Sequence, residues 1–187
     1  LCDTRCRTYN IAMRSIKIAP NEYYHVFNRG VNKQIIFHDH LDYWRFLFLI
    51  LYFQSSITFT NLGRTVSDFV RHVRHSVLHT IAEDVVKKRT VELIAFCIMP
   101  NHFHLILKEV EDGGIATYMQ RVLNAYSKYY NTKYEKSGHV FQGPYQAVHV
   151  EDDNQLLYLS AYIHRNPREM FKWLNKEKEY PWSSLQD

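Results

Sequence analysis

The chain has 187 residues and a formal net charge of +4, which permits an anionic partner without requiring one. Apolar residues make up 46%, enough for a packed core, so wholesale disorder is excluded, and the presence of only 6 glycines excludes collagen-like and low-complexity classes. The longest apolar run, near Phe46–Phe53, is about half as long as a membrane helix. The three cysteines are an odd count and Cys97 lies inside an apolar run, so we expect a reducing cytoplasm and no secreted disulfide scaffold.

The organisation of the chain is predicted to be simple. We expect one domain over residues 19–187, preceded at 1–18 by a polar N-terminal leader of uncertain role without a signal-peptide segment. Residues 64–89 predict a second, more polar helix with 6 basic and 3 acidic residues. We interpret this helix as part of an insertion into the domain near 54–90.

The first two elements are predicted from composition and capping. Tyr23–Phe27 is rich in aromatic and β-branched residues, which is typical of a strand. A helix over about 40–53 follows, because its apolar residues recur at helical spacing. Asp39 is the expected N-cap of this helix, with Asp42 as a capping-box partner.

The remaining elements predict a mixed α and β fold. Val91–Ile98 and His102–Lys108 indicate an antiparallel hairpin around a tight connection. Residues 115–130 give the clearest helical spacing in the chain, Tyr145–Val150 predicts a strand, and 154–166 predicts a last helix. This order favours an α+β fold, a ferredoxin-like antiparallel sheet with helices packed on one face.

Two histidines on the second strand of the hairpin are candidate metal ligands. His102 and His104 are two residues apart, so both imidazoles point to one side of the strand, and Phe103 points to the core side. Two neutral imidazoles at this spacing can share one divalent ion. With 11 histidines in the chain, such a pair also arises by chance, so a structural role stays open.

Other histidine groups are weaker candidates. His38 and His40 lie on either side of the predicted cap Asp39, and we expect them to be solvated surface. His72, His75 and His79 share one face of the predicted inserted helix, but no cysteine or carboxylate completes the set at zinc-finger spacing.

The last predicted helix carries a polar face away from its apolar stripe. At about 100° per residue, four polar side chains fall together on this face: Tyr158, Tyr162, Arg165 and Asn166. A phenol, a guanidinium and an amide together are typical of a functional site. The chain has 14 tyrosines, however, and half-buried packing tyrosines remain an alternative.

Four ordered segments resemble the HUH superfamily of single-tyrosine transposases, in particular its REP-associated branch. Residues 100–104, Pro-Asn-His-Phe-His, are similar to the His-hydrophobic-His signature of that superfamily. Residues 162–167, Tyr-Ile-His-Arg-Asn-Pro, are similar to the tyrosine-helix motif of the REP-associated branch. Residues 24–30 and 138–145 match further segments habitual in this branch, and the resemblance covers roughly residues 21–182.

The resemblance implies a specific chemistry. It implies metal-dependent nicking of single-stranded DNA and strand transfer through a 5′-phosphotyrosine, in DNA transposition or a domesticated equivalent. By this resemblance Tyr162 is the nucleophile, and His102, His104 and Asn166 are the metal ligands. Asn166 takes the place of a glutamine that is frequent in relatives, and Mg²⁺ or Mn²⁺ is the expected cofactor.

The partners follow from the same resemblance and from the charges. We expect single-stranded or hairpin DNA as partner, no membrane, and a prokaryotic cytoplasmic location; a homodimer stays open. Single strands are usually held by backbone contacts and aromatic stacking. The candidate DNA-binding residues are Arg29, Arg121, Lys128, Arg165 and Arg168.

The chemistry is consistent with these residue types. A phenol has a pKa near 10 and is a poor nucleophile unless it is helped, and a divalent ion can polarise the phosphate that it attacks. Two alternatives stay open: a catalytically silent hairpin-DNA-binding protein of the same fold, and a metal phosphodiesterase in which water attacks and Tyr162 only packs. A covalent protein–DNA adduct distinguishes the three.

Overall fold

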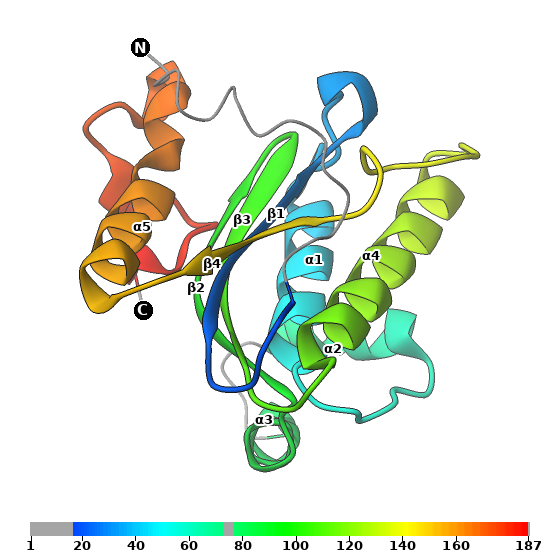
Figure 1. Cartoon of the computed structure of the whole chain (residues 1–187). Coiled ribbons are helices and arrows are strands. Elements are labelled where there is room, and N and C mark those ends of the chain that lie inside the picture. Colours follow the sequence, from blue (N-terminus) through cyan, green and yellow to red (C-terminus); the bar gives the residue numbers. More distant parts are fainter. Residues whose placement is uncertain (1–16, 73–76, 187) are drawn as a thin grey trace.

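A four-stranded antiparallel sheet forms the centre of the fold, with strand order β2-β3-β1-β4 (Figure 1). The computed structural model describes residues 17–72 and 77–186. The strands are β1 (Tyr23–Arg29), β2 (Val91–Met99), β3 (His102–Glu109) and β4 (Gln146–Val150). The helices are α1 (His40–Tyr52), α2 (Leu62–His72), α3 (Val77–Lys87), α4 (Gly114–Lys133) and α5 (Asp153–Arg165). The predicted element order and ferredoxin-like connectivity are confirmed.

The core lies between one face of the sheet and the helices α1 and α4. Alternate residues of β1 and β3 point to this face, among them Val26 and Phe103, and both are fully buried. The apolar stripe of α4 packs against them, so that Met119 and Tyr126 are also inaccessible. The apolar residues whose spacing of three and four predicted α4 are thus the ones that pack against the sheet.

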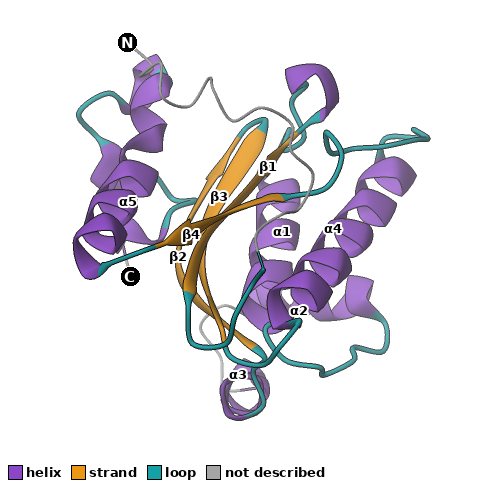
Figure 2. Ribbon diagram, in the orientation of Figure 1, coloured by secondary structure: helices purple, strands orange, loops and turns teal. Residues whose placement is uncertain are grey.

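The α5 helix lies on the opposite face of the sheet from α1 and α4 (Figures 1 and 2). It packs on β2, β3 and β4, and Ile163 is its one fully buried residue. The sequence predicted helices on one face only, and α5 differs. The difference matters because the face that α5 covers is the one that carries His102 and His104.

The region between α1 and β2 contains two helices, where the sequence predicted one over 64–89. The α2 helix ends at His72 and α3 begins at Val77, and the segment between them lies outside the described residues. Phe69 of α2 packs edge-on against Trp44 and Phe48 of α1. The apolar side of α2 therefore packs against α1.

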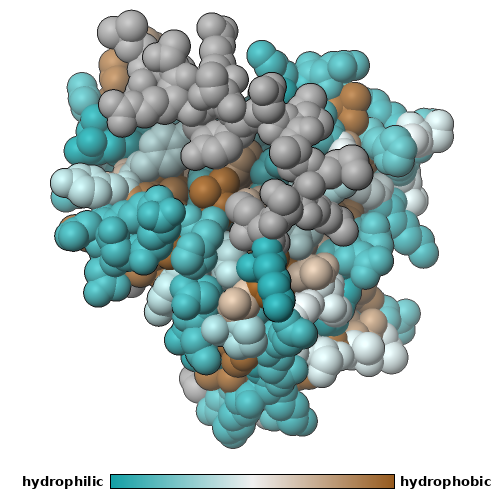
Figure 3. All heavy atoms as spheres, in the orientation of Figure 1, coloured by the Kyte–Doolittle hydropathy of each residue, from teal (hydrophilic) through white to brown (hydrophobic). Residues whose placement is uncertain are grey.

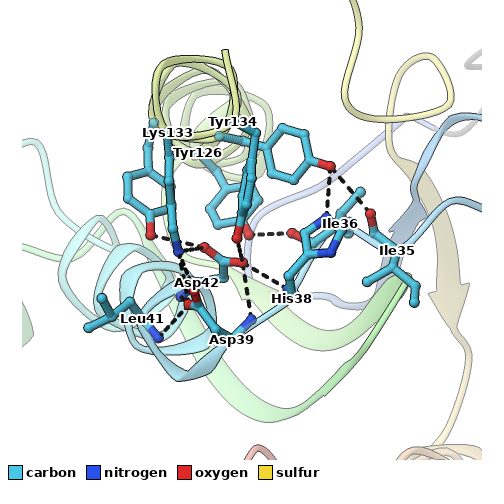
Figure 4. A network of polar contacts seen from close by, with 11 residues as sticks. Ile35, Ile36, His38, Asp39, Leu41, Asp42, Tyr126, Lys133 and Tyr134 are labelled. Carbon is cyan, nitrogen blue, oxygen red and sulfur yellow. Dashed lines mark hydrogen bonds and ion pairs between the residues drawn. The ribbon is translucent and has the colours of Figure 1, made fainter. Parts of the chain in front are cut away.

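A buried carboxylate joins the start of α1 to the end of α4 (Figure 4). Asp39 caps α1 and forms the predicted capping box with Asp42. Asp42 is inaccessible to solvent, and its carboxylate accepts hydrogen bonds from the backbone N–H of His38 and the side chains of Tyr129, Lys133 and Tyr134. Burial alone would raise the pKa of Asp42, but these hydrogen bonds outweigh it and lower the pKa.

The surface visible in Figure 3 is mostly hydrophilic, with apolar residues in small separate patches. Within residues 17–72 and 77–186, no helix is long and apolar enough to cross a membrane.

Candidate active site

The structure brings the two histidines of β3 and the tyrosine of α5 together. His102 and His104 point to the same face of the sheet, and their ring centroids lie 5.1 Å apart. The ring of Tyr162 meets the ring of His104 edge-on, with centroids 5.8 Å apart. Tyr162 is 44% exposed, so a substrate can reach it, and Tyr158 one turn earlier is 76% exposed. The sequence-predicted nucleophile and the metal-ligand pair thus share one site.

Both histidines of this pair are held in the neutral form. Burial lowers the pKa of His102 to about 4; the side chain of Asn166 opposes this shift and the nearby Arg29 adds to it. Burial, together with the neighbouring His25 and His102, places the pKa of His104 well below its usual value. A neutral imidazole is the form that binds metal ions, so the site needs no deprotonation at neutral pH.

Each ring of the pair has one nitrogen engaged. Nδ1 of His102 lies 2.7 Å from the amide oxygen of Asn101, and because that oxygen only accepts, Nδ1 of His102 is the donor. Nδ1 of His104 lies 2.9 Å from Nε2 of His25. In both histidines, therefore, Nε2 is the nitrogen left to meet a ligand.

Asn166 completes the donor set at the end of α5. Its side chain is almost fully buried, and its Nδ2 donates to the backbone carbonyls of Tyr162, at 3.0 Å, and Ile163, at 3.2 Å. This arrangement commits the nitrogen of the amide and leaves its oxygen, and the side chain is close enough to His102 to act on the pKa of that histidine. The third predicted ligand therefore lies beside the pair, although its side chain is one methylene shorter than a glutamine.

These donors are chemically suited to a divalent ion, but they do not fill its coordination shell. Two imidazole nitrogens and one amide oxygen suit Mg²⁺ poorly by themselves and Mn²⁺ better, and three protein ligands leave coordination positions for phosphate oxygens. Among the described residues, no group of three or more His, Cys, Asp or Glu side chains is arranged to hold a metal. The side chains of His72, His75 and His79 lie outside those residues, so the weaker candidate on the inserted helices stays a prediction.

The predicted DNA-binding residues fall into two groups. Arg29 is the direct cross-strand partner of His102 and is exposed, and its Nε donates to Gln142 across 2.6 Å. Arg165 is exposed at the last turn of α5, close to Asn166, and Arg168 just beyond it pairs with Glu177. These three residues lie in or directly after the elements that form the site.

Arg121 and Lys128 belong to α4, on the other side of the sheet (Figure 1). Arg121 donates to the backbone carbonyls of Ser55 and Ile57 and stacks on Phe53. Its guanidinium therefore holds the segment after α1 against α4. The structure does not bring these two residues to the site, and a DNA contact at either stays a prediction.

Sequence reasoning gave no role to His25 and Asn101, which the structure places in direct contact with the histidine pair. Both lie inside the segments that carried the family resemblance. Alternation along β1 places His25 on the same face as Arg29, and this signal was available in the sequence. The contact with His104 depends on the pairing register of β1 and β3, which the sequence does not specify.

Comparisons with known proteins show which fold and which family the chain resembles. Among solved structures, the chain is similar to a REP-associated tyrosine transposase bound to a REP hairpin, at 13% identity with a TM-score of 0.51, over 94% of this chain and 84% of that one. It is also similar to a putative transposase from Deinococcus radiodurans, at 14% identity with a TM-score of 0.34, over 81% of this chain and 95% of that one. No curated protein matches the chain.

The fold, an α+β ferredoxin-like sheet, is thus that of the REP-associated tyrosine transposase. A family model, "Transposase IS200 like", matches residues 59–166, which is more than half of the sequence. The chain belongs to the family of IS200-like transposases, and it is an enzyme of DNA transposition. The family resemblance that four sequence segments indicated is confirmed.

Proposed function

We propose that this chain nicks and rejoins single-stranded DNA in a metal-dependent reaction with Tyr162 as the nucleophile. One observation carries the proposal: α5 crosses the sheet so that the ring of Tyr162 meets His104, beside His102. The side chain of Tyr162 is 44% exposed, so a large substrate can reach part of it.

We assign two roles to the residues of the site, metal binding and nucleophilic attack. His102, His104 and Asn166 would hold a divalent ion, Mg²⁺ or Mn²⁺. When bound, the ion polarises the scissile phosphate and stabilises the leaving 3′ oxygen. The Oη of Tyr162 forms a bond to phosphorus as the bond from phosphorus to the 3′ oxygen breaks, which leaves a 5′-phosphotyrosine and a free 3′-hydroxyl. Attack by another 3′-hydroxyl reverses this step and joins two strands.

Arg29 and Arg165 are proposed to bind the DNA backbone on either side of the scissile phosphate. Arg29 lies next to His102 on β1, and Arg165 precedes the ligand Asn166. We propose a hairpin with a single-stranded flank as substrate, because the solved transposase with this fold was bound to a hairpin. Binding then depends strongly on salt.

The decisive experiment is a search for the covalent intermediate. Hairpins with single-stranded flanks are labelled at the 3′ end, because a 5′-phosphotyrosine holds the fragment on the 3′ side of the nick. They are incubated with the protein and Mn²⁺ and separated on a denaturing gel. A labelled band at the size of the protein plus DNA is expected, and Tyr162→Phe is expected to lose it. Cleavage without such a band would support hydrolysis by water, and hairpin binding without either would support a silent binding protein.

A further inference from the structure

His25 of β1 is joined to the proposed metal ligand His104 by a direct contact between two ring nitrogens. Nε2 of His25 lies 2.9 Å from Nδ1 of His104. The two ring planes differ by 23°, with centroids 5.1 Å apart. Two nearly coplanar rings that meet through their nitrogens form an in-plane hydrogen bond, and such a bond fixes both the position and the rotation of each ring.

The surroundings of His25 hold it in this orientation. Its ring packs against Phe27 on the same strand, with centroids 4.8 Å apart, and against the edge of Tyr162 at 6.4 Å. Pairing of β1 with β3 places Phe27 directly opposite His104, so His25 is the diagonal neighbour of His104 on the same face. His25 thus lies between the core of the sheet and the nucleophile.

The same arrangement recurs at the other histidine of the pair. Nδ1 of His102 donates to the amide oxygen of Asn101, which leaves Nε2 of His102 without a proton. Two histidines can share one ion only if both present a nitrogen with a free lone pair on the same side. His104 meets this condition if its proton is on Nδ1 and points toward His25.

Only one proton fits between the two nitrogens, so His25 decides which nitrogen of His104 is free. If His25 donated, the proton of His104 would be on Nε2 and would block that nitrogen. If His25 accepts, Nε2 of His104 carries the lone pair. We infer that His25 is a positioning residue that accepts a hydrogen bond from Nδ1–H of His104 and so presents Nε2 of His104 to the metal ion. This inference rests on the proposed function, because it gives His104 the role of a ligand.

His25 is not a third ligand in this arrangement. Its Nε2 is occupied by His104, and among the residues that the structure describes no three His, Cys, Asp or Glu side chains converge on one point. The role of His25 is therefore to orient a ligand, a role that buried partners of metal-bound imidazoles commonly have.

The first test reads the position of the protons without any metal. In protein labelled with ¹⁵N at histidine, long-range ¹H–¹⁵N spectra show which ring nitrogen carries the proton. We expect the Nδ1–H form at both His104 and His25 in the metal-free wild type. The Nε2–H form at His104 would overturn the inference, and this result does not depend on the activity of the protein.

The second test measures Mn²⁺ affinity by electron paramagnetic resonance, with the metal alone as probe. His25→Phe keeps a ring of similar size and removes the acceptor, and we expect affinity to fall roughly 10- to 100-fold. His25→Gln restores an acceptor oxygen and is expected to recover part of that loss. His149→Phe is the matched control, because His149 bonds to Glu22 at the outer strand β4 and should leave the affinity unchanged.

The outcomes separate the two proposals. Equal Mn²⁺ affinity in the wild type, His25→Phe and His25→Gln would overturn the role of His25 while leaving the metal site intact. If the wild type bound no Mn²⁺ but His104 carried its proton on Nδ1, the proposed metal site would fail and the hydrogen bond from His104 to His25 would stand. A loss of Mn²⁺ affinity in His25→Phe that His25→Gln partly restores supports the inference. If the loss came from a general disturbance of the structure, an acceptor oxygen at this position would not restore the affinity.

Discussion

The ring of Tyr162 meets the ring of His104 at 80°, with centroids 5.8 Å apart. One residue comes from α5 and the other from β3, and the contact exists because α5 crosses the sheet on the face opposite the main core. The proposed nucleophile and the proposed histidine ligands are thus held by two rigid elements rather than by a loop. Such placement keeps a reacting group within a narrow range of positions.

The first prediction separates Tyr162 from its neighbour Tyr158. Tyr162→Phe removes only the hydroxyl and should abolish the covalent adduct, because no oxygen remains to attack phosphorus. Hairpin affinity should stay within about twofold, since Arg29 and Arg165 are unchanged. Tyr158→Phe is the control and should still form the adduct, because Tyr158 is 76% exposed and lies one turn away. Mass spectrometry of the trapped adduct that mapped the nucleotide to Tyr158 would refute the assignment.

The second prediction concerns the histidine pair. Alternation along β3 alone predicts that the face with His102 and His104 lies outside the core, so that alanine at both positions would leave the fold intact. The structure corrects this expectation, because α5 covers the face and His104 is only 8% exposed. Replacement by leucine at His102 and His104 keeps more volume than alanine and supplies no donor atom, so it is the better test.

With both histidines replaced by leucine, Mn²⁺-dependent cleavage should fall at least 100-fold, because both proposed histidine ligands are lost. Hairpin binding without metal should persist. The readouts are cleavage on a denaturing gel and the thermal unfolding midpoint, with His149→Leu as control. Cleavage and metal affinity at wild-type levels in the double variant would show that the two histidines do not bind the ion.

The third prediction tests which face of the sheet binds DNA. Arg29→Ala and Lys128→Ala each remove one exposed cation, from β1 beside the site and from α4 on the other side. Arg29→Ala should weaken binding of a single-stranded hairpin flank and reduce the salt slope by about one. Lys128→Ala should change neither quantity. Fluorescence anisotropy at several salt concentrations measures both, and the reverse ranking would place the DNA on α4.

Local signals in the sequence predicted much of the fold. Composition predicted β1, an apolar run predicted β2 and alternation predicted β3. The spacing of apolar residues predicted α4, and the pair Asp39 and Asp42 predicted the capping box of α1. These features depend on residues close together in the chain. The motifs at 100–104 and 162–167 also predicted the main residues of the site.

The features that the sequence did not reveal are those that depend on distant pairing. Helical periodicity identifies the apolar stripe of α5 but not the face of the sheet on which that stripe packs. The contact of His25 with His104 needs the register of β1 against β3, which no local pattern encodes. Arg121 also reads as a free surface cation in sequence, yet it donates to backbone carbonyls of the segment after α1.

The last prediction concerns the buried carboxylate that joins α1 to α4. Asp42→Asn keeps the shape of the side chain but removes the charge that pairs with Lys133, and it leaves several buried donors poorly satisfied. Loss of one partner of a buried ion pair costs about 3 kcal/mol of stability. Asp39→Asn is the matched control, because Asp39 pairs with the same Lys133 at a half-exposed position and asparagine is an equally good N-cap, so its loss should stay below about 1 kcal/mol.

The effect of Asp42 also depends on pH, with a definite sign. The hydrogen bonds to its carboxylate lower its pKa in the folded state, so the unfolded chain binds the proton more readily. The stabilisation is therefore complete above the ordinary carboxyl pKa, about pH 4, and is lost as the pH falls through the lower folded value. We expect the free energies of unfolding of the wild type and Asp42→Asn, measured with urea from pH 7 down to pH 2, to become equal at the acid end. A constant difference in the free energy of unfolding over this range would mean that the charge of Asp42 does not contribute to stability.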